Sequence, residues 1–213
     1  MYPSCRGGAA SVSGGLLLLL LWFGMCSGWG LLGRILLGCT AHELGHCLAL
    51  HVLGGHVQSL RLTVLGAQIR ADCSRLSYGR EALAVLAGPA VNLISAGGLA
   101  LLAGRLQAPA LYLDAGIHFL LGGWNLLPIR SLDGRRALEL LVSGSRGPDA
   151  GGRILALSGA LCAGGLGGLL ILAMLRQGGS LWLAPAAAAL GRAAVSDLRA
   201  ACIFREEGRP HWV

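Results

Sequence analysis

The sequence predicts an all-α polytopic membrane protein with about six transmembrane helices and a short β-hairpin after the second. Charged residues make up 13% of the chain, about half of the roughly 25% that soluble domains carry. The mean hydropathy is +0.67. Apolar runs close to the roughly 20 residues that cross a bilayer recur along the chain. This composition favours a bilayer over water as the solvent.

The first half of the chain contains two predicted spans and a break. Residues 14–32 form the first span, interpreted as a retained anchor because no A-x-A-like cleavage site follows and apolar sequence continues directly. Residues 34–54 form the second. Residues 55–79 interrupt the apolar pattern, and their partial period-2 alternation around Gly66 predicts a short β-hairpin or an interfacial loop.

The second half contains three further spans and one weak candidate. The spans are expected at about residues 81–103, 111–129 and 154–175. The stretch between the last two is polar, is rich in glycine and arginine, and includes a short amphipathic helix. Residues 181–195 are the weak sixth candidate, because they fall short of the length that normally spans. Whether they cross completely stays open.

The arginines supply a topology for this arrangement. If the N-terminus faces the cytoplasm and six segments span, only Arg34, Arg105 and Arg176 of the 17 basic residues lie outside. This distribution agrees with the positive-inside rule. We therefore expect residues 1–195 to form one membrane-embedded domain with a cytosolic N-terminus, and residues 196–213 to form a polar C-terminal tail.

Several features are expected to carry no chemistry. The net charge of +7 is explained by topology, and no basic stripe with interleaved aromatics indicates a nucleic-acid partner. The seven cysteines contain no CxxC pair, so they do not predict a disulfide framework. Asp114 and His118, at i and i+4, are expected to pair with each other near the outer surface.

The stretch "HELGH" places ionisable groups inside the second predicted span. His42 and His46, at i and i+4, lie one turn apart on the same face of a helix, where both imidazoles can hold one Zn²⁺. Glu43 lies beside that face, where a general base can take a proton from water activated by the metal. Ionisable residues in a span are costly and therefore indicate function.

A catalytic zinc site normally needs a third protein ligand. The candidate carboxylates are Asp72, Glu81, Asp114 and Asp133. Asp133 is favoured because it follows the inner end of the fourth predicted span, where Pro128 breaks the helix and Gly134 permits an unusual turn. Freed backbone at that depth is tolerable only around a wet cavity lined by protein.

These motifs together resemble the site-2 protease family (peptidase M50) of intramembrane zinc metalloproteases. About 80 residues after HELGH, the stretch "NLLPIRSLDGRR" fits the N-x-x-P-x(4)-D-G pattern of that family. The stretch "AGPAVN" is similar to its G-P-x-x-N element. The matching residues are Asn125, Pro128, Asp133 and Gly134 in the first pattern and Gly88, Pro89 and Asn92 in the second. The resemblance is closest to the sporulation-factor-processing branch.

The resemblance implies a metal site and an activity. One Zn²⁺ is expected on His42, His46 and Asp133, with Glu43 activating the water. The substrate is expected to be a transmembrane or membrane-associated protein, such as a sporulation sigma-factor precursor, with a membrane regulatory protein as a further partner. The implied location is the cytoplasmic membrane of a bacterium, with the active site toward the cytosol.

Two asparagines and a Gly-Pro pair have more than one interpretation. Asn125 and Asn92 are candidates to position the substrate strand or to stabilise the oxyanion. A helix-end cap beside Pro128 is an equal alternative for Asn125. Gly88 and Pro89 are structural members of the motif, and a kink that lets helices pack closely is compatible with that role.

The predicted hairpin suggests how a substrate helix is presented. Residues 61–69 are a candidate edge to which an unwound substrate adds as a strand, although arginines bound to lipid headgroups explain the segment equally well. Two other functions compete with proteolysis of this type. One is a non-proteolytic membrane metal-binding or transport protein. The other is a prenyl-protein protease, which the Asp-Gly context of Asp133 disfavours.

Overall fold

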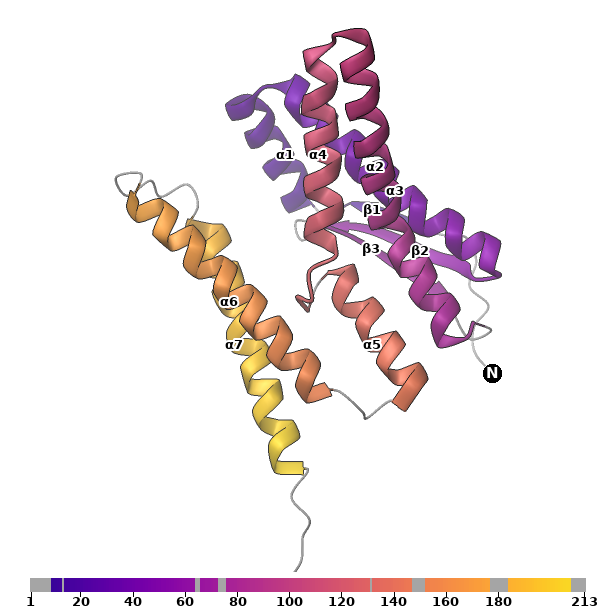
Figure 1. The fold of residues 1–213 in the computed structure, drawn as a ribbon, viewed down its shortest axis with the longest axis vertical. Helices are drawn as coiled ribbons and strands as arrows, with labels where there is room; N and C mark the ends of the chain where they lie inside the picture. The colour runs from indigo at the N-terminus through magenta and orange to yellow at the C-terminus, as the bar shows by residue number, and fades with distance from the viewer. Residues whose placement is uncertain are drawn as a thin grey trace, which may run out of the picture. The chain divides into compact units, whose positions relative to one another are not determined.

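The structure is a computed structural model that describes residues 9–12, 14–63, 66–72, 76–130, 132–146, 152–176 and 184–207. The chain divides into two compact units, Met1–Trp124 and Asn125–Val213, and each is described by itself. Figure 1 shows the elements, which in chain order are β1 (Ala9–Val12), α1 (Gly14–Ser27), α2 (Trp29–Leu53), β2 (His56–Thr63), β3 (Gly66–Asp72), α3 (Tyr78–Leu106), α4 (Pro109–Asn125), α5 (Asp133–Arg146), α6 (Gly152–Arg176) and α7 (Ala184–Glu207).

The first two helices divide at Gly28 and not after residue 32 as predicted. Gly28 has φ +89°, a conformation that glycine adopts without steric cost, so α1 ends before it and α2 begins after it. At its other end α2 stops at Gly54, which is left-handed and donates its N–H to the carbonyl of His51. Helix α2 therefore carries the whole HELGH motif without interruption.

The predicted hairpin is confirmed, and it belongs to a three-stranded sheet. Strands β2 and β3 pair antiparallel, while β1 pairs parallel with the other edge of β2 (Figure 1). Arg61 is therefore paired with Ser11 on one side and Gln68 on the other. The expectation that residues 61–69 form an exposed edge is wrong for the part in β2, because β1 occupies that edge. The β3 part lies at the other side of the sheet.

Helices α2, α3 and α4 approach one another closely where glycines omit a side chain. A Cβ on Gly45 of α2 would lie 2.9 Å from the carbonyl oxygen of Ala87 in α3. A Cβ on Gly122 of α4 would lie 3.0 Å from the carbonyl oxygen of Pro89 in α3. Pro89 sits inside α3 and is fully buried. These contacts hold the three helices as one packed group around the HELGH segment.

In the second unit, α7 packs along α6 (Figure 1). Their shared apolar core contains Ala163 of α6 and Leu190 and Ala194 of α7, together with Ile129 from the segment before α5. The predicted amphipathic helix is confirmed as α5. The predicted boundary after residue 195 falls inside α7, because the helix continues to Glu207 and buries Asp197 completely.

Among the described residues, three helices are long and apolar enough to cross a membrane. These are α2, α3 and the part of α6 from Ile154 to Arg176. They indicate a mainly helical membrane protein. The expected count of six spans is not confirmed, because α1 and α4 have only 14 and 17 residues and α7 is too polar.

Candidate metal centre

His42 and His46 form the centre of the site in the first unit. Both are buried, with 6% and 8% of their surface exposed, and their Nε2 atoms are 3.1 Å apart. The two rings are edge-on, with an interplanar angle of 84°. Two nitrogens that bind one tetrahedral zinc at roughly 2.0–2.1 Å are about 3.3 Å from each other. The spacing of the two imidazoles therefore fits a shared zinc ion.

A hydrogen bond at Nδ1, the nitrogen that does not approach His42, fixes the orientation of the His46 ring. Its Nδ1 lies 3.0 Å from the carbonyl oxygen of Ala84. Because a carbonyl only accepts, Nδ1 carries the proton, and the Nε2 of the neutral ring keeps its lone pair for a metal. A Cβ on Gly88 would lie 2.6 Å from Cε1 and 2.8 Å from Cδ2 of this ring. The glycine of the predicted Gly-Pro element thus makes room for the second ligand.

His42 contacts Asn92 of α3, which in turn contacts His118 of α4. Its Nδ1 lies 3.3 Å from Nδ2 of Asn92, and Oδ1 of Asn92 lies 3.1 Å from Nδ1 of His118. Asn92 has no exposed surface and His118 is 7% exposed. Both atoms of the Asn92 amide are therefore engaged between two histidines. The predicted role of Asn92 in positioning substrate stays a prediction.

Sequence reasoning missed the role of His118. Its expected partner Asp114 pairs instead with Arg34 of α2, at 2.5 Å. The spacing of Asp114 and His118 permitted a contact between them. However, nothing in the sequence indicates that Arg34 of α2 pairs with Asp114 or that Asn92 of α3 contacts His118. The only available signal was a histidine in a predicted span, which by itself indicates function.

Glu43 follows His42 in α2 and is half-buried. One residue step turns the side chain by about 100° around the helix, so Glu43 lies beside the two-histidine face and not on it. The role of Glu43 as the general base stays a prediction. Glu81, a candidate third ligand, lies in the first turn of α3.

Asp133 is the first residue of α5, in the second unit. The turn before it is tight: a Cβ on Gly134 would lie 2.9 Å from Cα of Leu126 and closer still to its carbonyl group. Leu126 directly follows Asn125, the last residue of α4. Pro128 lies inside this turn and is half-buried. The N-x-x-P-x(4)-D-G stretch is therefore a compact turn in which Gly134, next to the candidate third ligand, packs against Leu126.

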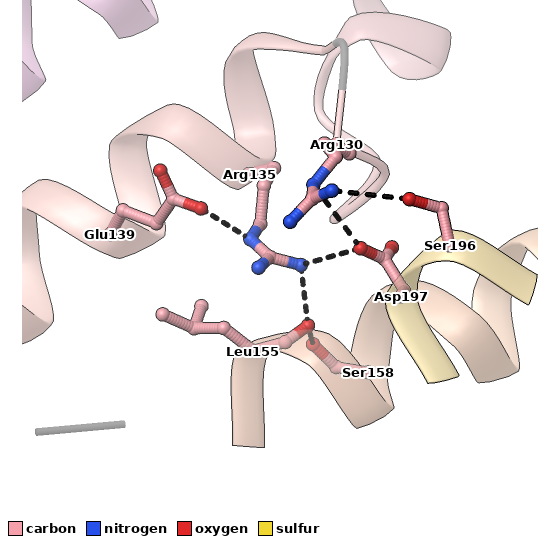
Figure 2. Close-up of polar contacts among 7 residues, drawn as sticks. All are labelled: Arg130, Arg135, Glu139, Leu155, Ser158, Ser196 and Asp197. Carbon is pink, nitrogen blue, oxygen red and sulfur yellow. Dashed lines mark hydrogen bonds and ion pairs between the residues drawn. The ribbon is translucent and has the colours of Figure 1, made fainter. Parts of the chain in front are cut away.

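Buried charges hold α5 to the last two helices (Figure 2). Arg135 is 6% exposed on its side chain and donates from Nη1 to the carbonyl oxygen of Leu155 at 2.7 Å. The same Nη1 lies 3.8 Å from Oδ1 of Asp197, and Arg130 approaches that oxygen at 3.6 Å. Glu139 accepts from Nε of Arg135 at 2.7 Å. This network fixes the residues that flank Asp133, and sequence reasoning missed it.

No protein-family model and no curated protein sequence matches the chain. Among solved structures, the chain is similar to the Site-2 Protease from Methanocaldococcus jannaschii, with a TM-score of 0.56 and 21% sequence identity. The match covers 92% of this chain and 88% of that chain. The comparison shows a shared fold and confirms the predicted likeness to site-2 proteases at that level. The sporulation branch stays a prediction.

Proposed function

We propose that the protein is an intramembrane zinc endopeptidase that hydrolyses a peptide bond in or near a transmembrane segment of a membrane-associated substrate. The observation that carries this proposal is the pair of buried Nε2 atoms of His42 and His46, 3.1 Å apart in a helix apolar enough to span. A carboxylate, Glu43, follows the first of them. The site-2 protease fold supports the same function.

Asp133 is the third ligand in this proposal. His42, His46 and Asp133 are residues of types that could together hold a metal ion. Two histidines and one carboxylate are a known catalytic zinc set with an open position.

The residues of the chain divide the chemistry between them. When bound, zinc would polarise the scissile carbonyl and make water a stronger acid. Glu43 accepts a proton from the attacking water while the oxygen of that water bonds to the carbonyl carbon. The C–N bond then breaks, and Glu43 returns the proton to the leaving nitrogen. Asn125 and Asn92 remain candidates to position the substrate strand.

We also propose a location and partners. The protein would lie in a bacterial cytoplasmic membrane, with its N-terminus and site toward the cytosol. Its substrate would be a transmembrane or membrane-associated protein, and a second membrane protein would regulate it. If the six segments expected from the sequence span, the charge distribution supports this orientation, since only Arg34, Arg105 and Arg176 then lie outside.

The test compares Glu43→Gln with Glu81→Gln in the purified full chain. Each protein is reconstituted in vesicles with a fluorogenic transmembrane substrate, and its bound zinc is measured separately. Glu43→Gln should keep zinc and lose cleavage, because the amide cannot accept the proton. Glu81→Gln should keep both. Normal cleavage by Glu43→Gln would refute the assigned base.

Two further outcomes test the metal site. Asp133→Asn should lower zinc occupancy, whereas unchanged occupancy would show that another residue is the third ligand. Wild-type protein that binds zinc but cleaves none of a panel of transmembrane segments would favour the metal-binding or transport function over proteolysis.

A further inference from the structure

The contacts of His42 point to two residues that act on the metal through it. We infer that Asn92 and His118 are positioning residues: when Nε2 of His42 binds zinc, Asn92 accepts the hydrogen bond from Nδ1 of His42, and His118 accepts one from Asn92. The inference rests on the proposed zinc site. It assigns to His118 a role that the sequence did not reveal, and to Asn92 a role besides contact with substrate.

The position of the proton on His42 decides which of its nitrogens can bind zinc. A neutral imidazole has one protonated and one bare nitrogen. If Nε2 binds zinc, Nδ1 carries the proton and needs an acceptor, because the ring is buried. The side chain that the structure places against this nitrogen is Asn92, 3.3 Å away. The structure has Nδ2 of Asn92 on this nitrogen, so the zinc-binding state requires a half-turn of the amide that brings Oδ1 to His42.

The other end of the Asn92 amide contacts His118. With Oδ1 toward His42, Nδ2 faces Nδ1 of His118, which is 3.1 Å from the amide. Nδ2 donates, so Nδ1 of His118 must be bare and accept. Asn92 has no exposed surface, so water cannot replace this partner. The position of the proton on the His118 ring therefore depends on the position of the proton on the His42 ring, although the Asn92 amide separates the two rings.

The hydrogen bonds that run from His118 through Asn92 to His42 have two self-consistent directions. The oxygen and nitrogen of a side-chain amide exchange places by a half-turn. In the opposite direction, which matches the amide orientation in the structure, His118 donates to Oδ1, Nδ2 donates to Nδ1 of His42, and Nε2 of His42 donates to Nε2 of His46 across 3.1 Å. Only the first direction leaves both Nε2 atoms bare. Binding of zinc would select it.

These steps explain why an amide stands at this position. Asparagine serves both directions, since it has one donor and one acceptor end. An aspartate has an acceptor oxygen at both ends, so it can accept the hydrogen bond from Nδ1 of His42 in the zinc-binding direction. A leucine has nearly the same shape and serves neither. Substitutions at residue 92 therefore separate hydrogen bonding from packing.

The experiment measures zinc affinity of the full chain in detergent micelles by competition with a chromophoric chelator. Asn92→Leu should weaken binding by about 10- to 100-fold, the usual effect of removing a partner of a ligating histidine. Asn92→Asp should stay near the wild-type affinity. Asp114→Asn is the matched control on α4, because Asp114 pairs with Arg34 and not with the histidines. It should have no effect.

His118→Leu gives a second variant that leaves Asn92 in place. It should also weaken binding. The double variant with Asn92→Leu should be no weaker than Asn92→Leu alone, because both changes interrupt one chain of hydrogen bonds. Additive losses would show that the two residues act separately and would overturn the inference.

Nitrogen NMR of histidine-labelled protein supplies a readout that packing alone would not change. The His42 signals are assigned by their loss in His42→Ala. With zinc, the wild type should show a protonated Nδ1 at His42. Without zinc, His118→Leu should change the proportion of the two His42 tautomers relative to the wild type. An Asn92→Leu protein with wild-type affinity and tautomer would overturn this inference alone. Wild-type protein that binds no zinc would overturn the proposed function with it.

Discussion

Replacing Gly88 by alanine tests whether the empty space beside His46 is needed for metal binding. The new Cβ would lie 2.6 Å from Cε1 and 2.8 Å from Cδ2 of the ring, about 1 Å shorter than an optimal carbon–carbon contact. The ring must move by a similar distance, which breaks its 3.0 Å hydrogen bond to Ala84. Overpacking costs about 1–3 kcal/mol, and the lost hydrogen bond about 0.5–1.5 kcal/mol.

The sum, about 1.5–4.5 kcal/mol, corresponds to a loss of roughly 10- to 2,000-fold in zinc affinity if the strain is relieved by displacing the ligand. The assay is chelator competition on purified protein. Gly97→Ala is the matched control on the same helix, because its Cβ would meet nothing within 4 Å. It should keep zinc affinity and gain up to about 1 kcal/mol of stability from helix propensity. Equal zinc affinity in the two variants would refute the reasoning.

Three further predictions concern the surroundings of the site. Gly134→Ala should lower zinc occupancy, because its Cβ would collide with the backbone of Leu126, and equal occupancy in wild type and variant would contradict this. Asp197→Asn should destabilise the chain by about 3 kcal/mol or more in thermal unfolding, because it leaves the buried Arg135 without its buried counter-charge; an unchanged melting temperature would count against it. Asp114→Asn should cost only about 0–1 kcal/mol, since its pair is partly exposed to solvent, and a larger loss in the same unfolding assay would disprove this estimate.

The helical part of the site was predictable because it depends on local geometry. The i, i+4 spacing brings the two histidines together wherever the segment is helical, and the structure has them 3.1 Å apart. The hairpin was predictable for a similar reason, since alternation has a period of two. The contacts of Asn92 were not predictable, because they require α2, α3 and α4 to be packed together.

The remaining errors have physical causes. The break at Gly28 was missed because apolar residues continue on both sides, and only the backbone angle marks it. Strand β1 was missed because four residues with a distant partner leave no period to detect. Residues 196–207 were assigned to a polar tail because of their charges. One of those charges, Asp197, is buried against Arg135, so polarity marked an internal contact and not an exposed end.

The pairing of Arg135 with Asp197 has a consequence for biosynthesis. The two residues are separated by roughly 60 positions, which a ribosome adds in about 3 to 12 seconds. During that time Glu139, one turn away, is available to the guanidinium. Asp197 is not yet made. The helix that begins with Asp133 can therefore be fixed only after the last helix has emerged. A chain that stops before residue 197 would insert its apolar segments. It would lack the Arg135–Asp197 ion pair that holds the helix beginning with the candidate ligand Asp133.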